Sequence, residues 1–394
     1  MPEQLLFIDL TSADPRERGR QYGSAARELI ARSVDFYAEL FQRTAGLRWE
    51  EATARARAWV PLVDDYLPGI LDEIRGIAEG AERDFEEILA LNARFELSQS
   101  NPFDDKADEG CTSFALLAQA NGVGHVLCGQ NWDWRERVAD TVVVLRVQQP
   151  GRPTFICQTE AGQVGRHGAN SAGLALNANG LGGGFETGLS VPGTFVRRKI
   201  LESWDVYDAL RAAFQVTQSA PSNLLITHRD GFAIDLETTP GRHGWMYPTD
   251  GLLVHGNHFQ AFVPPQIEGT YRPFSVDSLF RVPRVTDGLR AARTVTSSSA
   301  LRAHVREVMS DHFAHPNGVC QHADPRRHEA DRYQTVVSSL VDLSTGEYLL
   351  TAGLPCEKAY VQAPWNLYDG PAAPTRPAWG QSSSPAPHAA AHTG

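Results

Sequence analysis

The residues Glu109-Gly110-Cys111-Thr112-Ser113 stand where this chain changes character, and Gln130-Asn131-Trp132-Asp133-Trp134 follows shortly after them. Apolar residues recur at helical spacing before Cys111, whereas strand and turn patterns prevail after it. Cysteine is most often a small buried residue, so a Gly-Cys pair alone is weak evidence. At this boundary it suggests that the bond before Cys111 is cut, which would leave a thiol and an α-amine on one residue.

The composition is ordinary for a globular protein of one or two domains, with 42% hydrophobic and 21% charged residues among 394. The net charge of −11 argues against nucleic acid as a partner. No apolar stretch approaches the length of a membrane span, so we expect no membrane partner. The first residues lack the basic start and apolar run of a signal peptide, and we therefore expect a cytoplasmic protein.

The cysteines are few, odd in number and widely spaced, which favours free thiols in a reducing compartment over a disulfide framework. They are Cys111, Cys128, Cys157, Cys320 and Cys356.

The first hundred residues are predicted to be mostly helical after a short strand at 5–10. The helices are expected at 16–42, 49–63, 68–81 and 84–97. Gly69, Gly76 and Gly80 would allow close approach to a neighbouring helix. Residues 101–109 are polar, acidic and rich in turn formers, which indicates an exposed linker where a cut is possible.

Many short strands follow, with helical stretches at 197–213 and 278–309. We expect the strands at 111–118, 125–132, 141–149, 154–159, 174–181, 223–228, 232–237, 251–259, 334–343 and 348–353. This order is not a βαβ repeat, so it predicts an α+β protein with largely antiparallel sheets and helices packed outside. From residue 370 the composition turns to Pro, Ala, Ser and His, which predicts a disordered tail over 370–394.

Amide cleavage by a terminal cysteine needs a base for the Cys111 thiol, and the residue's own α-amine has a suitable reference pKa of about 7.7–8.0. While the Gly110–Cys111 bond is intact, that nitrogen is an amide and cannot serve. The uncut chain would therefore lack turnover and react only with itself. The thiol would attack the Gly110 carbonyl, an N→S acyl shift would follow, and water would hydrolyse the thioester. Glycine at position 110 permits the strained backbone and close attack that this step requires.

Other polar residues are candidates for supporting this chemistry. Asp133 stands at the end of the strand that pairs with the Cys111 strand, where a carboxylate could orient the amine; the alternative is a simple cap or turn residue. Asn177, Asn179 and Asn257 stand in or after apolar strands, where asparagine is disfavoured. Each could donate to the oxygen of a tetrahedral intermediate or could be a turn residue.

The chain resembles a known family at several motifs spread over residues up to about Trp365. The motifs are Gly110-Cys111-Thr112, Gly129-Gln130-Asn131-Trp132-Asp133, Asn170-Ser171-Ala172-Gly173-Leu174, Asn257-His258-Phe259, Ser338-Ser339 and Gly353-Leu354-Pro355. They are similar to those of the acyl-CoA:6-aminopenicillanic acid acyltransferases (isopenicillin N acyltransferases) and their autoproteolytic amidohydrolase relatives. The resemblance implies an N-terminal-nucleophile (Ntn) hydrolase fold, a four-layer αββα sandwich, with autocleavage between Gly110 and Cys111.

The resemblance also implies roles for individual residues. Cys111 matches the nucleophile, Asp133 the aspartate that supports the terminal cysteine, and Asn257 the asparagine of the oxyanion site. Asn179 matches, more weakly, a second oxyanion-site position of related bile-salt and penicillin V amidases. We therefore expect a helical segment of residues 1–110, released by autocleavage but still associated, and a catalytic chain of residues 111–369.

The function expected is a self-processing cysteine amidohydrolase or acyltransferase that cleaves or forms an amide bond through a thioester on Cys111. Its partners would be a small-molecule amide or acyl donor and its own cleaved N-terminal chain. One alternative is an acyl-CoA-dependent N-acyltransferase acting on a β-lactam or small peptide-like amine. A second is a non-catalytic binding protein on the same fold. We expect no cofactor, although acyl-CoA is possible as a co-substrate.

Two further groups of residues have more than one explanation. The residues His312, His315, Cys320, His322 and His328 crowd into one stretch, and such residues can bind zinc. Their spacings fit no standard finger or helical metal motif, so we expect a substrate-facing loop or lid and no metal. The aromatic residues Trp132, Trp134, Phe185, Trp245 and Phe259 are candidates for lining an apolar acyl pocket or for packing in the core.

Overall fold

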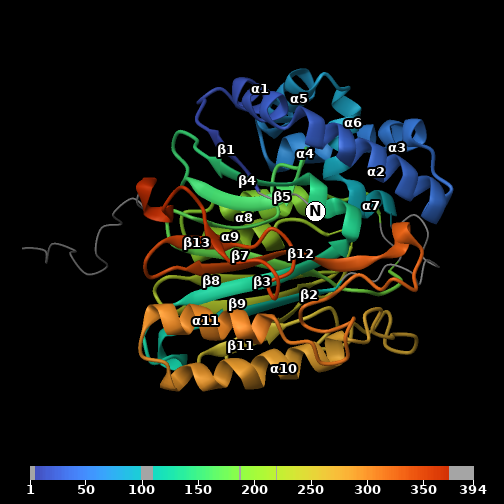
Figure 1. The fold of residues 1–394 in the computed structure, drawn as a ribbon. Helices are drawn as coiled ribbons and strands as arrows, with labels where there is room; N and C mark the ends of the chain where they lie inside the picture. The colour runs from blue at the N-terminus through green and yellow to red at the C-terminus, as the bar shows by residue number, and fades with distance from the viewer. Residues whose placement is uncertain (1–4, 99–109, 186–187, 219, 372–394) are drawn as a thin grey trace, which may run out of the picture.

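Two β-sheets lie face to face in this protein, with helices on both outer sides (Figure 1). The structure is a computed structural model, and it describes residues 5–98, 110–185, 188–218 and 220–371. The predicted α+β class and the four-layer αββα arrangement are confirmed. The expected linker (101–109) and nearly all of the expected tail (370–394) lie outside the described residues.

The larger sheet has the strand order β1-β4-β5-β6-β7-β8-β9-β10. Its strands are β1 (Leu6–Leu10), β4 (Val142–Val147), β5 (Phe155–Glu160), β6 (His167–Asn170), β7 (Leu174–Gly180), β8 (Ser222–His228), β9 (Phe232–Thr238) and β10 (Gly244–Met246). Strand β1 runs parallel to β4, and the other neighbours are antiparallel. The N-terminal segment therefore contributes an edge strand to a sheet built from the rest of the chain.

The second sheet is antiparallel throughout, with the order β11-β2-β3-β12-β13-β14. Its strands are β2 (Cys111–Leu116), β3 (Leu127–Arg135), β11 (Leu252–His255), β12 (Tyr333–Asp342), β13 (Glu347–Leu350) and β14 (Val361–Gln362). Side-chain hydrogen bonds join the two sheets. Gln130 Nε2 donates to the Ala178 carbonyl oxygen at 2.8 Å, and Gln158 Nε2 donates to Ser339 Oγ at 3.1 Å.

Helices from the N-terminal segment cover the outer face of the larger sheet (Figure 1). They are α1 (Pro15–Ala25), α2 (Arg27–Ala45), α3 (Trp49–Ala56), α4 (Val60–Tyr66), α5 (Ile70–Ala81), α6 (Phe85–Asn92) and α7 (Arg94–Ser98). A Cβ on Gly76 would stand 1.9 Å from the Arg16 carbonyl oxygen, so this glycine does allow α1 and α5 to touch. Gly69 does not provide a close approach, because a Cβ there would meet no neighbouring atom within 4 Å. This glycine precedes α5 and has a φ of 86°.

Four later helices complete the outer layers. Helices α8 (Gly193–Leu201) and α9 (Val206–Phe214) lie on the side of the larger sheet, where α8 contacts β6 and β7. Helices α10 (Ser278–Arg290) and α11 (Ser298–Met309) cover the second sheet (Figure 1). The apolar residues between α10, α11 and this sheet form a core of their own, which includes Phe114, Val285 and Leu340.

Several elements differ from their predicted bounds. The helix expected at 16–42 is broken at Ala26, whose φ of −111° separates α1 from α2. The helix expected at 197–213 is also two helices, because the Asp205 carboxylate caps α9 by accepting the Asp208 N–H at 2.9 Å. Strand β11 ends at His255 rather than at residue 259, so Asn257 lies in the loop beyond it. Among the described residues, no helix is both long and apolar enough to cross a membrane.

Candidate active site

The pairing of β2 with β3 brings Cys111 and Asp133 together. Cys111 is opposite Trp132 in the ladder, and the backbone N–H of Asp133 donates to the Gly110 carbonyl oxygen at 2.8 Å. The expected pairing of these two strands is therefore present, but Asp133 lies inside β3 and not at its end. Cys111 is 2% exposed and its Sγ lies 4.0 Å from the Asp133 carbonyl oxygen.

The Asp133 carboxyl is buried in the second sheet, between β2 and β12. Its Oδ1 accepts a hydrogen bond from Thr335 Oγ1 at 2.6 Å, since Thr335 is its partner in the β3–β12 ladder. Its Oδ2 has no hydrogen-bond partner among the described residues and stands 3.2 Å from where a Cβ on Gly110 would be. Burial raises the pKa of Asp133 to about 7, although the positive charge of Arg281 and the Thr335 hydrogen bond act to lower it.

Asn257 contacts the backbone nitrogen of Cys111 directly. Its Oδ1 accepts the Cys111 N–H at 2.7 Å, and its Nδ2 donates to the Gly180 carbonyl oxygen at 3.0 Å. The loop after β11 supplies this residue, because β11 pairs with β2 so that His255 stands opposite Ser113. An amide nitrogen carries two hydrogens, and the Gly180 carbonyl oxygen is the acceptor of one of those on Asn257.

Arg281 of α10 ties these groups together from the other side of the sheet. Its Nη1 donates to the Cys111 carbonyl oxygen at 2.7 Å and to Thr112 Oγ1 at 2.6 Å. Its Nη2 donates to Asn257 Oδ1 at 2.9 Å and lies 3.3 Å from Asp277 Oδ1. The side chain is fully buried. The guanidinium therefore fixes both Cys111 and the asparagine oxygen that holds the Cys111 nitrogen.

Asn179, at the end of β7, belongs to the larger sheet and supports the site from there. Its Nδ2 donates to Ser113 Oγ at 3.0 Å and to the His255 carbonyl oxygen at 3.1 Å. Both of its amide hydrogens are thus directed at protein acceptors, which joins β7 to β2 and β11. In this arrangement Asn179 braces the strands that carry Cys111 and Asn257.

A cavity of about 160 Å³ adjoins Gly110, and its lining includes Gly110, Phe274, Val276, Phe280, Asn317 and Gln321. The aromatic candidates are divided. Phe185 and Phe259 pack in one apolar cluster with Leu181 and Ile267, close in sequence to Gly180 and Asn257. Trp132 and Trp134 are in the main core, and Trp245 is 54% exposed on β10.

Sequence reasoning missed two residues that contact the predicted ones, Arg281 and Thr335. Arg281 lies in a helix where nothing distinguishes it from the exposed Arg284 three residues later. Thr335 is one polar residue among several in a buried strand. Thr335 could be singled out only after the 334–343 strand had been paired with the Asp133 strand in the correct register.

A known protein family matches more than half of this sequence. The sequence model of the family described as "Acyl-coenzyme A:6-aminopenicillanic acid acyl-transferase" matches residues 119–352. The chain belongs to this family. The matched span contains Asp133, Asn179, Asn257 and Arg281, and it begins after Cys111. Family membership makes this chain an enzyme and argues against the non-catalytic binding protein.

One curated relative is the acyl-coenzyme A:6-aminopenicillanic-acid-acyltransferase 40 kDa form of Emericella nidulans. It is 34% identical over 247 residues, which cover 62% of this chain and 67% of the relative.

The matches to solved structures are more distant. The Caenorhabditis elegans N-acylethanolamine-hydrolyzing acid amidase ortholog has a TM-score of 0.39 and 17% identity, over 59% of this chain and 93% of that chain. Penicillin V acylase from Agrobacterium tumefaciens has a TM-score of 0.40 and 14% identity, over 61% of this chain and 82% of that chain.

Proposed function

We propose that this chain is a self-processing cysteine acyl-transfer enzyme of the N-terminal-nucleophile type. It would cut its own Gly110–Cys111 bond and then carry acyl groups as a thioester on Cys111. One observation supports this most. The backbone nitrogen of Cys111, which a cut would turn into an amine, donates to Asn257 Oδ1 at 2.7 Å in a buried site that also contains Asp133.

The first reaction would be on the chain itself. The Cys111 thiolate attacks the Gly110 carbonyl carbon, a C–S bond forms, and the C–N bond to Cys111 breaks as the nitrogen takes up a proton. The oxygen that gains charge already accepts the Asp133 N–H at 2.8 Å, which is the geometry of an oxyanion donor. Water then hydrolyses the thioester and leaves a Gly110 carboxylate, a free thiol and a free amine. Asp133, with a pKa of about 7, is suited to exchanging protons near neutral pH.

After the cut, the same residues would serve external substrates. The amine of Cys111 accepts the thiol proton and returns it to the leaving group. Asn257 Oδ1 and the Asp133 carboxylate would orient that amine. The second N–H of Asn257 would donate to the developing oxyanion. Arg281 holds the Cys111 carbonyl oxygen and is a positioning residue.

The two products would remain one folded unit. Strand β1 is part of the larger sheet, and the main apolar core includes residues from both sides of the cut. Buried ion pairs also bridge them: Arg198 Nη1 donates to Glu73 Oε1 at 2.8 Å, and Arg94 Nη2 donates to Glu160 Oε1 at 2.6 Å. A buried ion pair is costly to break because each partner would be left charged without compensation. We therefore propose an associated segment of residues 1–110 and a catalytic chain of residues 111–369.

The substrate class we propose is a small amide or acyl donor whose apolar acyl group contacts the cluster of Leu181, Phe185, Phe259 and Ile267. Leu181 follows Gly180, the acceptor of Asn257 Nδ2, so this cluster adjoins the site. The acyl acceptor would be water or an amine. Use of acyl-CoA as donor, with a β-lactam or peptide-like amine as acceptor, is a second candidate favoured by the family match and by the name of the relative from Emericella nidulans.

The test begins with denaturing mass spectrometry of the purified wild-type chain. We expect two fragments that meet between Gly110 and Cys111, formed without added protease. The processed enzyme is then incubated with a panel of acyl amides, or with acyl-CoA and amines, while free acid and new amide are measured separately. An acyl adduct trapped on Cys111 supports the proposal, and a wild-type chain that turns over substrate while uncut contradicts it.

A further inference from the structure

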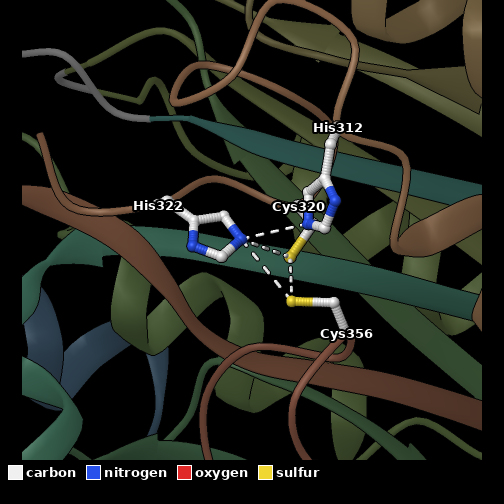
Figure 2. A group of neighbouring side chains, drawn as sticks. All are labelled: His312, Cys320, His322 and Cys356. Atoms are coloured by element: carbon white, nitrogen blue, oxygen red, sulfur yellow. Dashed lines mark hydrogen bonds between the residues drawn. The ribbon is translucent and has the colours of Figure 1, made fainter.

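Four side chains from two separate loops converge on one point (Figure 2). His312, Cys320 and His322 come from the segment that follows α11, and Cys356 comes from the loop between β13 and β14. Each turns its Nε2 or Sγ atom toward the others, and these four atoms lie within 4.8 Å of one another. Two imidazoles and two thiols thus face a common centre.

The distances between these atoms can be compared with those of a tetrahedral metal site. The Sγ atoms of Cys320 and Cys356 are 3.6 Å apart, and the Nε2 atoms of His312 and His322 are 3.0 Å apart. His322 Nε2 lies 3.7 Å from Cys320 Sγ and 3.5 Å from Cys356 Sγ. Zinc bonds of about 2.3 Å to sulfur and about 2.0–2.1 Å to nitrogen give tetrahedron edges of about 3.8 Å (S–S), about 3.5 Å (S–N) and about 3.3 Å (N–N). These four spacings match the corresponding edges to within a few tenths of an ångström, and the two distances from His312 Nε2 to the sulfur atoms are no longer than 4.8 Å.

A disulfide does not explain the arrangement. The 3.6 Å between the two sulfur atoms is far longer than the roughly 2.0 Å of an S–S bond, and both cysteines are free thiols. A disulfide would also not explain why His322 Nε2 lies near both sulfur atoms while His312 Nε2 lies beside it. Two soft thiolates with two imidazoles are a ligand set typical of zinc.

We propose that His312, Cys320, His322 and Cys356 form a structural Zn²⁺ site. Four protein ligands close the coordination sphere, which is typical of structural rather than catalytic zinc. The two thiols lose their protons to the solvent when the metal binds. The metal would tie the segment after α11 to the β13–β14 loop, and this revises the expectation of no metal.

The zinc site would lie one residue from the wall of the active site. Gln321 follows Cys320, and its backbone N–H donates to Thr335 Oγ1 at 3.0 Å, the same hydroxyl that donates to Asp133. The Gln321 side chain lines the cavity beside Gly110. The proposed effect of the metal is therefore to hold this cavity wall in place. No reaction step passes through the metal.

Sequence spacing concealed this site because one ligand is distant. The other three lie within eleven residues, but Cys356 arrives only through the β12–β13 hairpin, 34 residues after His322. The remaining two members of the predicted cluster, His315 and His328, are not in the four-residue group.

Metal analysis of the full chain tests the proposal. The protein is expressed with added zinc and without a polyhistidine tag, purified under a non-thiol reductant, and assayed by plasma mass spectrometry. We expect about one zinc per chain in the wild type and a loss of that zinc in Cys356→Ser and His322→Ala. His304→Ala removes a histidine of α11 that bonds to the Gly288 carbonyl oxygen, and as the matched control it retains the zinc.

A second measurement does not depend on the variants folding. Replacement of the metal in the wild-type protein by Co²⁺ gives the visible and thiolate charge-transfer bands of tetrahedral cobalt if the proposal holds. A wild-type chain without zinc and without these cobalt bands overturns it, as does a Cys320–Cys356 disulfide found in place of the metal. Zinc that both variants retain overturns the assignment as well.

Discussion

The side-chain oxygen of Asn257 accepts the backbone N–H of Cys111 at 2.7 Å, although 146 residues separate the two in the chain. Cys111 is buried, so its N–H needs a hydrogen-bond partner, and this partner comes from the loop after β11. If that nitrogen becomes an amine, the same oxygen would orient it as the base beside the thiol.

Replacement of the nucleophile should leave the precursor intact. We expect Cys111→Ala to give one uncut chain without turnover, because no other group can form the thioester. Cys128→Ala is the matched control: Cys128 is a buried cysteine on the adjacent strand, opposite Ala115. This control should still be cut before residue 111. Denaturing mass spectrometry reads both outcomes, and a Cys111→Ala chain that is cut at the same bond would refute the mechanism.

The pH dependence of self-processing should report on Asp133. A carboxyl with a pKa of about 7 becomes a base as the pH rises through 7. We therefore expect the wild-type processing rate to rise up to about pH 7 and then level off. Asp133→Asn should process slowly and lose that inflection. The measurement is a time course of precursor loss at several pH values, and an unchanged inflection in Asp133→Asn excludes this carboxyl as its source.

The same pKa shift has a thermodynamic consequence in the uncut Cys111→Ala chain. Burial raises the pKa of Asp133 from 3.8 to about 7, so between these values the folded chain binds more protons than the unfolded chain. Its contribution to stability is present below about pH 4 and is lost as the pH rises through 7, by roughly 4 kcal/mol in total. Urea unfolding should show this slope in Cys111→Ala and a flatter one in Cys111→Ala/Asp133→Asn.

Arg281 should affect both the stability of the fold and the rate of processing. A lysine keeps the charge but cannot donate to Cys111, Thr112 and Asn257 at once. Loss of hydrogen bonds worth about 1.5–3 kcal/mol predicts a roughly 10- to 100-fold slower self-cleavage in Arg281→Lys. Arg284→Lys, on the exposed side of the same helix, is the control and should process normally. Equal rates for the two variants would remove Arg281 from the site's positioning role.

Replacement of the two asparagines should have different effects, one on catalysis and the other on stability. We expect Asn257→Ala to lower kcat of the processed enzyme by about 10²–10³, the usual effect of losing an oxyanion donor. Asn179→Ala should mainly lower stability, by about 1–3 kcal/mol, because Ser113 Oγ and the His255 carbonyl oxygen lose their buried donor. A kcat loss in Asn179→Ala as large as that in Asn257→Ala would show that Asn179 itself contacts the reacting oxygen.

Local sequence was sufficient for the parts of this fold that rest on local physics. Apolar periodicity predicted most helices and strands, and the change of pattern at Cys111 located the start of β2. The partnership of Cys111 with Asp133 followed because their strands are consecutive in the chain. Arg281 and Cys356 could not be found in this way. Each becomes significant only when α10 packs under β2, or when the β13–β14 loop meets the segment after α11.

The surroundings of Gly110 also predict which acyl groups the processed enzyme can accept. A Cβ at this position would stand 2.8 Å from Gln321 Oε1 and 3.2 Å from Asp133 Oδ2. An acyl donor whose carbonyl replaces that of Gly110 brings its own α-carbon to the same place. The space around Gly110 thus limits the acyl groups of later substrates, and straight acyl chains should be favoured over those branched next to the carbonyl.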